Sequence, residues 1–286
     1  MELLESAGLL PTSARSLPPL VLHQPASVAE ALACLQASET PVIVAGGTDL
    51  VACWNEGLPA RELVDISAIA ELRSVQQDQG LLQIGALVTH HAGSGDARVR
   101  AAVPGFARAW SRIANPRIRF RATLGGNLMA RRTRYEGALL LRALQAQLEF
   151  ATPAGPHWSS VDALWSQGLP LHALLRGVTL DATELLAFEY ERSLRPLYTQ
   201  AMSLWRDARG LRLDLVVATE YLRPLALSLP LPGVSAPQLA ARARAIADDV
   251  LSALPDSFRD ALVTPGYVRR AGAALLARQL GVLDVQ

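Results

Sequence analysis

The sequence predicts an α+β protein with a larger N-terminal domain and a smaller C-terminal domain. In the first two thirds of the chain, short apolar runs typical of strands alternate with amphipathic helical segments. Strand patterns with alternating polarity follow, and two amphipathic helices end the chain. The length of 286 residues and the hydrophobic content of 50% are sufficient for a large core and for two domains.

The N-terminal domain is expected to alternate strands and helices. Residues 1–25 mix Pro, Ser and Leu without a period, so we expect an irregular arm. Ser27 begins a helix over 27–36, because Glu30 stands three residues on as a capping-box partner and apolar residues follow at helical spacing. The other elements expected here are strands over 42–45, 62–67, 81–87, 117–124 and 148–152 and helices over 99–113 and 137–147.

The composition loosens after residue 156, and we place the domain boundary near 180–186. The chain therefore divides into an arm (1–25), an N-terminal domain (26–184) and a C-terminal domain (185–286). The elements expected in the C-terminal domain are strands over 185–192, 197–206 and 211–221 and helices over 236–254 and 267–280.

All 27 basic residues are arginine, against 26 acidic residues. The absence of lysine excludes a Schiff-base lysine, a lysine base and a phosphate-loop lysine. The net charge of +1 argues against general nucleic-acid binding, which needs a basic surplus. The stretch 97–135 nevertheless contains ten arginines and no acidic residue. We expect most of them on a solvated face and a few around an anionic ligand.

Cys34 and Cys53 are the only cysteines. They are too few for an iron–sulfur cluster or a cysteine-based zinc site, and we interpret them as small hydrophobic side chains. His90 and His91 adjoin an expected strand, on which neighbours point to opposite faces and do not easily share a metal. No metal site is therefore expected. Neither a membrane span nor a secretory signal is expected, so the sequence predicts a cytoplasmic protein.

Two glycine pairs, Gly46-Gly47 and Gly125-Gly126, each follow an expected strand. Such a pair allows successive backbone N–H groups to point at one anion without a Cβ in the way. Two such turns can hold the two phosphates of a dinucleotide from opposite sides. For each pair alone, a tight turn without a ligand has equal weight. The two together, each followed by a small polar residue (Thr48 and Asn127), favour a ligand site.

Several segments of the chain are distinctive together: AGGTDL (45–50), LVDIS and ELRSV (within 63–75), IGALVTH (84–90), NPRIRFRATLGGN (115–127) and PGYVRRAGAALLARQL (265–280). They resemble the FAD-binding (medium) subunit of the molybdenum hydroxylases, the family of carbon monoxide dehydrogenase and xanthine dehydrogenase. The resemblance runs from about residue 20 to 152 and continues more weakly into the C-terminal domain.

The resemblance implies an FAD-binding fold. Two α/β subdomains of the PCMH and vanillyl-alcohol oxidase type are expected over 26–184. A C-terminal flavoprotein domain with a small, three-stranded antiparallel sheet and helices is expected over 185–286.

The resemblance also implies FAD as the cofactor and assigns residues to it. Two pyrophosphate loops are expected, and Glu136 falls where the family has an acidic residue near the adenosine ribose. An acid favoured at a helix N-terminus by the dipole is an equally weighted interpretation of Glu136. No catalytic residue is assigned. The implied cofactor-binding residues are Val44, Ala45, Gly46, Gly47, Thr48, Asp49, Leu50, Thr123, Leu124, Gly125, Gly126, Asn127 and Glu136.

The segment 128–135 departs most from the relatives, which usually carry small residues there. Here it contains Arg131, Arg132 and Arg134. These arginines are candidates for binding a phosphate, a partner subunit or an acidic substrate, or they have drifted on the surface of a degenerate copy. The C-terminal domain retains only ERSLR (191–195) of the family's pattern after its first strand.

The leading hypothesis is an FAD-binding oxidoreductase subunit that passes electrons from molybdopterin and iron–sulfur partner subunits through FAD to an acceptor. One alternative is a stand-alone FAD-dependent oxidoreductase that acts directly on a small molecule, and another is a binding or scaffold protein that has lost FAD. Self-association is the alternative to partner subunits. Under the leading hypothesis, Gly46→Val or Gly126→Val is expected to abolish FAD retention in a protein that still folds.

Overall fold

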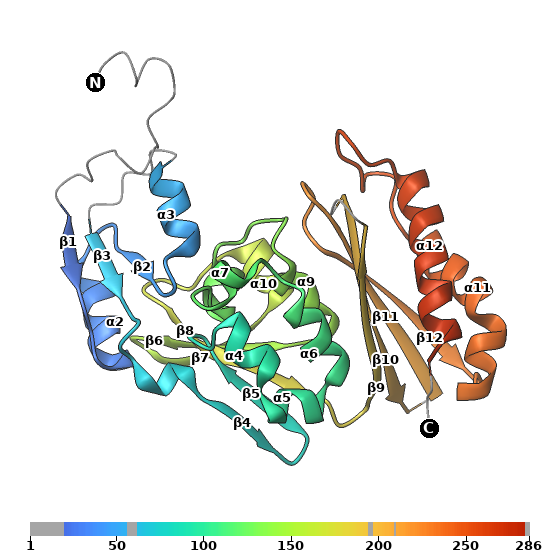
Figure 1. The fold of residues 1–286 in the computed structure, drawn as a ribbon, viewed down its shortest axis with the longest axis horizontal. Coiled ribbons are helices and arrows are strands. Elements are labelled where there is room, and N and C mark those ends of the chain that lie inside the picture. Colours follow the sequence, from blue (N-terminus) through green and yellow to red (C-terminus); the bar gives the residue numbers. More distant parts are fainter. Residues whose placement is uncertain (1–19, 56–61, 194–196, 209, 284–286) are drawn as a thin grey trace.

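The protein is described from a computed structural model, which covers residues 20–55, 62–193, 197–208 and 210–283. Three sheets follow one another from one end of the molecule to the other, with helices between and beside them (Figure 1). The expected arm lies outside the described residues up to residue 19. Its last part is not irregular, because Val21–His23 form a strand, β1.

The first sheet is parallel, in the order β1-β3-β2. Its other strands are β2 (Val42–Val44) and β3 (Glu62–Asp65), and its helices are α2 (Val28–Ala37) and α3 (Thr48–Asn55). The side chain of Ser27 caps α2 by accepting from the N–H of Glu30 at 3.2 Å, as the capping pattern predicts. The Glu30 carboxylate reaches back to the N–H of Ala26.

The second sheet is antiparallel, in the order β4-β5-β8-β6-β7. Its strands are β4 (Val75–Asp78), β5 (Leu81–Gly85), β6 (Gln147–Thr152), β7 (Gly155–Ser160) and β8 (Leu174–Asp181). The helices around it are η2 (Ala70–Arg73, a 3-10 helix), α4 (His90–Gly95), α5 (Ala97–Ala102), α6 (Pro104–Ser111), α7 (Pro116–Arg119), α8 (Leu124–Met129), α9 (Glu136–Ala143) and α10 (Val161–Gln167).

Two expectations for this region are wrong. The helix expected over 99–113 is split into α5 and α6, because Pro104 has no N–H to continue a helix and instead starts the next one. The strand expected over 117–124 is the helical turn α7, which Asn115 caps by accepting from the N–H of Ile118. The second glycine pair therefore lies inside α8 and does not follow a strand.

The third sheet is antiparallel and has four strands, in the order β12-β11-β10-β9, where three were expected. The added strand, β12, lies at the edge beside β11. The elements are β9 (Leu185–Arg192), β10 (Tyr198–Asp207), β11 (Gly210–Thr219), β12 (Leu225–Pro232), α11 (Ala236–Ser252) and α12 (Pro265–Gly281).

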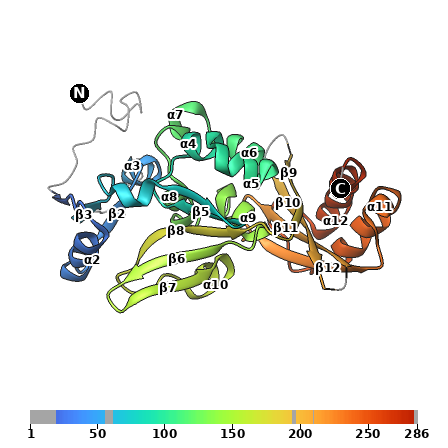
Figure 2. The same ribbon diagram turned by 90° about the horizontal axis from the view of Figure 1, so that it is seen from below.

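Helices cover both faces of this third sheet (Figure 2). α11 and α12 pack on the outer face, and α6 and α9 pack on the inner face. Because both faces are covered, nearly all of β10 is buried, and its polar side chains have partners inside the protein. Gln200 bonds Gln279 of α12, and Ser203 donates to the carbonyl of Ala143 at the end of α9.

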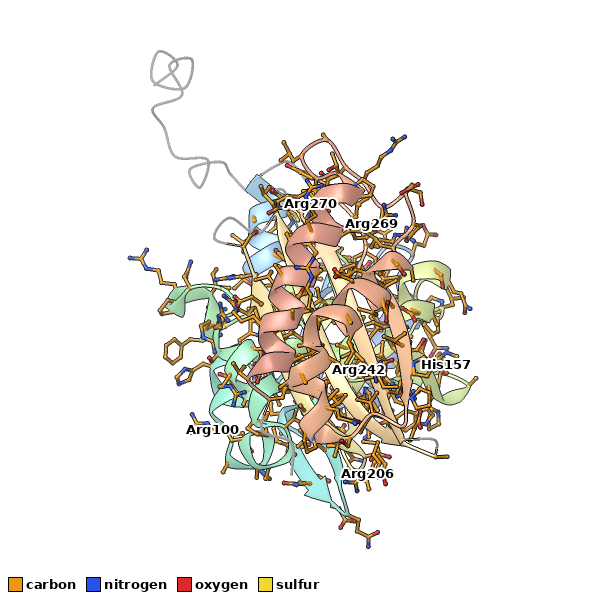
Figure 3. All side chains as sticks on the ribbon, turned by 90° about the vertical axis from the view of Figure 1, so that its right-hand side faces the viewer. Arg100, His157, Arg206, Arg242, Arg269 and Arg270 are labelled. Carbon is orange, nitrogen blue, oxygen red and sulfur yellow. The ribbon has the colours of Figure 1, made fainter. Side chains whose placement is uncertain are left out.

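One hydrophobic core joins the second sheet to the third. It includes Phe106 of α6, Leu140 of α9 and, from the third sheet, Phe188 and Val216. A second core fills the space under α11 and α12. The first core contains residues from both sides of residue 184. The domain boundary proposed there stays a prediction. Arg242 lies on α11, and Arg269 and Arg270 lie on α12 (Figure 3).

Candidate functional site

The first glycine turn connects β2 to α3. Gly47 has a φ of +73°, in the left-handed region that favours glycine, and a Cβ at this position would meet only Val44 Cγ1, at 3.9 Å. Helix α3 begins at the next residue, Thr48. The first N–H groups of a helix have no acceptor within it and carry the positive end of its dipole. The turn is therefore open and suits an anion such as a pyrophosphate.

Gly46 packs directly against the second glycine segment. A Cβ on this residue would overlap the carbonyl group of Arg121. The Arg121 side chain reaches back, and its Nε donates to the carbonyl oxygen of Gly46 at 3.4 Å. Glycine is thus required at position 46 because the two segments touch. Sequence reasoning did not single out Arg121, although it stands two residues before the second glycine motif.

The second glycine segment forms the first turn of α8, and Thr123 is its N-cap. Its N–H groups already have acceptors in the protein. Leu124 donates to the Val88 carbonyl and Gly125 to the Ala86 carbonyl, both at 2.9 Å, while Gly126 donates to Oγ1 of Thr123 at 3.0 Å. This segment therefore does not offer a row of free N–H groups to a phosphate.

The two glycines of this segment differ in their surroundings. Gly125 is buried, and a Cβ there would lie 2.8 Å from the carbonyl oxygen of Ala86. Gly126 is exposed, and a Cβ there would meet only Thr123 Oγ1, at 3.0 Å. Gly126 is therefore the position at which a ligand can approach the backbone closely.

Asn127 joins α8 to α9. Its Oδ1 accepts from the N–H of Gly137 at 3.1 Å, and a Cβ on Gly137 would overlap that oxygen. Asn127 therefore fixes the start of α9, and glycine is required at position 137. Sequence reasoning missed Gly137, for which the available signal was a glycine in the first turn of a helix, where it lowers helix propensity.

Glu136 lies in the first turn of α9, and its side chain is 11% exposed. Its Oε1 accepts from the hydroxyl of Tyr190 and pairs with Arg192 Nη1 at 3.1 Å. Burial and the neighbouring Glu136 carboxylate both raise the pKa of Tyr190. Two side chains of β9 therefore hold this carboxylate, and its role beside a ribose stays a prediction.

Asp49, Cys53, Arg132 and Tyr135 form a group that we call the Asp49 cluster. Oδ1 of Asp49 accepts from Arg132 Nε at 2.8 Å and from the Tyr135 hydroxyl at 2.5 Å. Arg132 Nη2 also contacts the sulfur of Cys53. The cluster fastens the start of α3 to the segment 128–135. That segment is held to the C-terminal domain as well, because Thr133 Oγ1 donates to the Glu220 carbonyl.

The cluster shifts the pKa values of its members. Burial favours the neutral form of Asp49, but the hydrogen bonds from Arg132 and Tyr135 outweigh burial and lower the pKa of this carboxyl. Burial, together with the hydrogen bond to Asp49, raises the pKa of Tyr135 to about 12. At neutral pH the cluster is therefore an arginine–carboxylate pair with a neutral phenol.

The three arginines of the segment 128–135 differ in their contacts. Arg132 is paired with Asp49, so its charge is already balanced. Arg131 is exposed, has a φ of +46° and donates to the Leu164 carbonyl at 3.4 Å. Arg134 is exposed and lies over the ring of Tyr135. A ligand-binding role of the three stays a prediction, and Arg131 and Arg134 are the more available to a ligand.

His90 and His91 begin helix α4 and do not lie on a strand. His90 is fully buried, and its Nδ1 accepts from Trp110 Nε1 at 2.7 Å. Burial, with the nearby charge of Arg119, lowers the pKa of His90 to about 4, so the ring is neutral. His91 is exposed and lies against the ring of Phe120. Within the described ranges, no group of three or more His, Cys, Asp or Glu side chains is placed to hold a metal.

Arg119 of α7 connects this helix to α4 and α6. Although it is almost completely buried, its guanidinium has four partners. Nη1 donates to the carbonyls of Trp110 and Ile113, and Nη2 donates to the carbonyl of His90 and to Ser94 Oγ. Arg119 is thus one arginine of the stretch 97–135 that supports the structure and does not face a solvent-borne ligand.

The open turn at the N-terminus of α3 lies against the second glycine segment, and this arrangement suits an anionic ligand. A family model described as "FAD binding domain in molybdopterin dehydrogenase" matches residues 16–186, more than half of the chain. The chain belongs to this family. No helix in the described part of the chain is long and apolar enough to cross a membrane.

Curated relatives match about half of the chain. The xanthine dehydrogenase FAD-binding subunit of Escherichia coli O157:H7 is 33% identical over 135 residues, which is 46% of each protein. The carbon monoxide dehydrogenase medium chain of Afipia carboxidovorans is 32% identical over 135 residues, 46% of this chain and 47% of the relative. These alignments thus span about half the length of the relatives.

Solved structures match almost the whole fold. Quinoline 2-oxidoreductase from Pseudomonas putida 86 aligns with a TM-score of 0.78 and 23% identity, over 94% of this chain and 97% of that one. Carbon monoxide dehydrogenase from Hydrogenophaga pseudoflava aligns with a TM-score of 0.75 and 22% identity, over 92% and 96%. The third sheet and its helices are therefore part of a fold shared with these enzymes.

Proposed function

We propose that this chain is the FAD-binding subunit of a molybdenum-hydroxylase-type complex, passing electrons from molybdopterin and iron–sulfur partners through FAD to an acceptor. The main support is the contact between Gly46 and Arg121, which brings the two glycine motifs of the family together. Relatives named as FAD-binding or medium subunits of such dehydrogenases support the same role.

The residues present fit FAD. The first turn and the start of α3 suit the pyrophosphate, since Gly47 leaves open space there and the helix N-terminus favours an anion. Arg121, exposed beside Gly46, adds positive charge at the same place. Gly126 allows close approach from the other side. When bound, FAD supplies one- and two-electron transfer, and the protein binds and orients it.

Partner subunits are part of the proposal because of the ligand count. A [2Fe–2S] cluster takes four cysteine thiolates, and this chain has two cysteines. Cys34 and Cys53 also lie on different helices, α2 and α3. The clusters that deliver electrons must then belong to another chain. Self-association and a cytoplasmic location stay predictions.

The test is to purify the tagged chain from its own cells and measure flavin, iron and molybdenum together. We expect about one FAD per chain, with iron and molybdenum in partner subunits that co-purify. Turnover by the isolated flavin-containing chain, without those metals, would favour the stand-alone enzyme. A chain that takes up no FAD even on reconstitution would favour the scaffold protein.

A matched pair of glycine variants tests the site itself. Gly126→Ala places a methyl group where the ligand is proposed to approach, and it should lower the retained FAD. Gly95→Ala is the control, because Gly95 is also an exposed glycine of a short helix and a Cβ there meets nothing within 4 Å. Equal flavin content in the two variants would contradict the assignment.

A further inference from the structure

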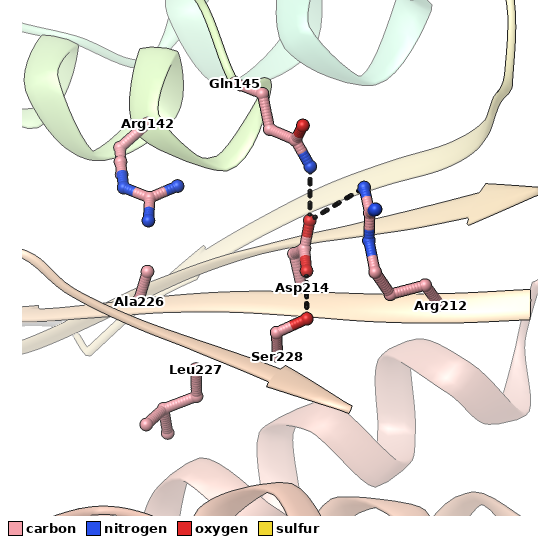
Figure 4. Close-up of a pocket in the computed structure, with 7 residues that line it drawn as sticks. All are labelled: Arg142, Gln145, Arg212, Asp214, Ala226, Leu227 and Ser228. Atoms are coloured by element: carbon pink, nitrogen blue, oxygen red, sulfur yellow. Dashed lines mark hydrogen bonds and ion pairs between the residues drawn. The ribbon is translucent and has the colours of Figure 1, made fainter. Parts of the chain in front are cut away.

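A cavity of about 320 Å³ lies between the FAD-binding part and the C-terminal sheet (Figure 4). Helix α9 bounds it on one side and strands β11 and β12 on the other. It is close to the C-terminal end of α9, whereas Glu136 begins that helix. Arg142 lies six positions after Glu136 in this helix, about 9 Å along the axis. The cavity is thus distinct from the proposed FAD site. It is lined by Arg142, Gln145, Arg212, Asp214, Ala226, Leu227 and Ser228.

Two arginines of the lining have unused hydrogen-bonding capacity. The Nε atoms of Arg142 and Arg212 are buried and have no hydrogen-bond acceptor in the protein. Arg142 Nε lies 2.6 Å from Asp162 Oδ2, but this is an ion pair without hydrogen-bond geometry, and Asp162 is 59% exposed. A buried N–H without an acceptor is unfavourable, so a ligand oxygen here would satisfy it.

Asp214 does not accept a hydrogen bond from the Nε of either arginine. Its Oδ2 accepts from Gln145 Nε2 at 2.6 Å, and its Oδ1 accepts from Ser228 Oγ at 2.7 Å. Arg212 Nη2 reaches Asp214 only at 3.4 Å. Asp162 lies beside Arg142, and the adjoining second cavity adds Arg223, so the two cavities together are lined by three arginines and two carboxylates.

Gln145 is held in an uncommon backbone conformation beside this cavity. It follows α9 with a φ of +53°, in the left-handed region where Gly and Asn are favoured. Its side chain bonds Asp214. Such strain in a residue other than glycine is found more often at binding sites than elsewhere.

Apolar surface continues the cavity on both sides of Arg142. Ala226 of β12 lines the first cavity with its side chain, whereas the side chain of Leu227 packs in the core under α11 and α12 (Figure 4). Arg142 also lines a second cavity of about 270 Å³, where Val161, Trp165 and Pro224 supply the apolar wall. A ligand whose acid group meets Arg142 and Arg212 would therefore rest its body on apolar side chains.

We propose that this cavity binds a small organic carboxylate with an apolar or aromatic body. The carboxylate oxygens accept from the guanidinium groups of Arg142 and Arg212, which suit planar oxyanions. The body lies against Ala226 or extends past Arg142 toward Trp165. The site is independent of the FAD role and uses none of the residues assigned to it.

The test titrates the purified full chain with sodium benzoate by calorimetry, with benzamide as the neutral analogue of the same shape. Sodium chloride and inorganic phosphate at equal ionic strength are the other arms. We expect saturable binding of benzoate and none of benzamide or chloride. Binding of phosphate as tight as that of benzoate would overturn the apolar-body part of the proposal, and equal binding of benzamide would overturn the carboxylate part.

Variants locate the binding. Arg212→Gln should weaken benzoate binding about tenfold or more, as expected for loss of a charged hydrogen bond. Arg244→Gln is the matched control, because Arg244 is an exposed arginine of α11 far from the lining. Ala226→Leu fills the cavity without changing its charge and should also weaken binding, so the test does not depend on Arg212→Gln folding. Unchanged affinity in Ala226→Leu, or equal loss in Arg244→Gln, would overturn the proposal.

Discussion

Arg132 donates from Nε to Oδ1 of Asp49 over 2.8 Å, and this pair joins segments 83 residues apart. Asp49 lies in the first turn of the helix that follows the first glycine turn, and Arg132 belongs to the segment 128–135. Arg132 thus connects the segment 128–135 to the first turn of α3.

A double-mutant cycle measures this pair. Arg132→Gln, Asp49→Asn and the double variant should give a coupling of about 1 kcal/mol in the free energy of unfolding, the range of partly exposed ion pairs. Urea unfolding at neutral pH gives the four values. Arg134→Gln is the control, since Arg134 is exposed and contacts the ring of Tyr135. A double variant whose loss equals the sum of the singles would show that the pair contributes nothing.

The glycines of the two segments should respond differently to alanine. Gly46→Ala places a Cβ on the Arg121 carbonyl, so we expect a loss of about 2 kcal/mol or more of unfolding free energy. The geometry thus argues against the expectation that Gly46→Val leaves a folded protein. Gly126→Ala should keep the melting temperature and lose FAD. Thermal unfolding and the flavin-to-protein absorbance ratio separate the two effects, and a stable Gly46→Ala protein would contradict the packing argument.

His90 should make the protein sensitive to mild acid. Its folded-state pKa of about 4 lies below the ordinary value of 6.5, so only the unfolded chain takes up a proton between these values. Stability from this residue is complete above pH 6.5 and falls as the pH drops toward 4, by up to about 3 kcal/mol.

Variants of the two adjacent histidines check this assignment. His90→Asn keeps an acceptor for Trp110 Nε1 and removes the titrating ring, so it should flatten the pH dependence of urea unfolding between pH 7 and 5. The exposed neighbour supplies the control, because His91→Asn should leave the dependence as it was. The same pH profile in both variants would refute the role of His90.

Arg119 and Arg117 form another matched pair on α7. Arg119→Met removes four hydrogen bonds and leaves three carbonyls without that donor, so we expect a loss of about 3 kcal/mol. Arg117 is exposed on the same short helix, and Arg117→Met should change stability little. Denaturant unfolding of both variants gives the comparison, and similar losses would show that burial of Arg119 adds nothing.

Local patterns in the sequence predicted the first half of the site. The strand before Gly46, the glycine turn and most other strands follow from periodicity and capping, which depend on neighbouring residues. The strand predicted over 117–124 in the second half was wrong, because alternating arginine and apolar residues there have the pattern of a strand. One of those arginines, Arg119, is buried, and it is satisfied by carbonyls up to 29 residues away.

The rest of the site depends on contacts between residues that are far apart in the sequence, which local patterns do not predict. No pattern within 128–135 indicates that Arg132 pairs with Asp49, because the two meet only in the folded chain. The same holds for Gly46, whose need for glycine comes from Arg121. A close approach to the backbone at Gly46 was predicted correctly, but the group that approaches is the backbone carbonyl of Arg121 and not a phosphate.

The N–H groups of Leu124, Gly125 and Gly126 all have acceptors within the chain. Completion of this half of the site therefore does not wait for a cofactor. The backbone conformation of this half of the site is fixed by contacts within the chain, so a ligand that binds there does not have to order it.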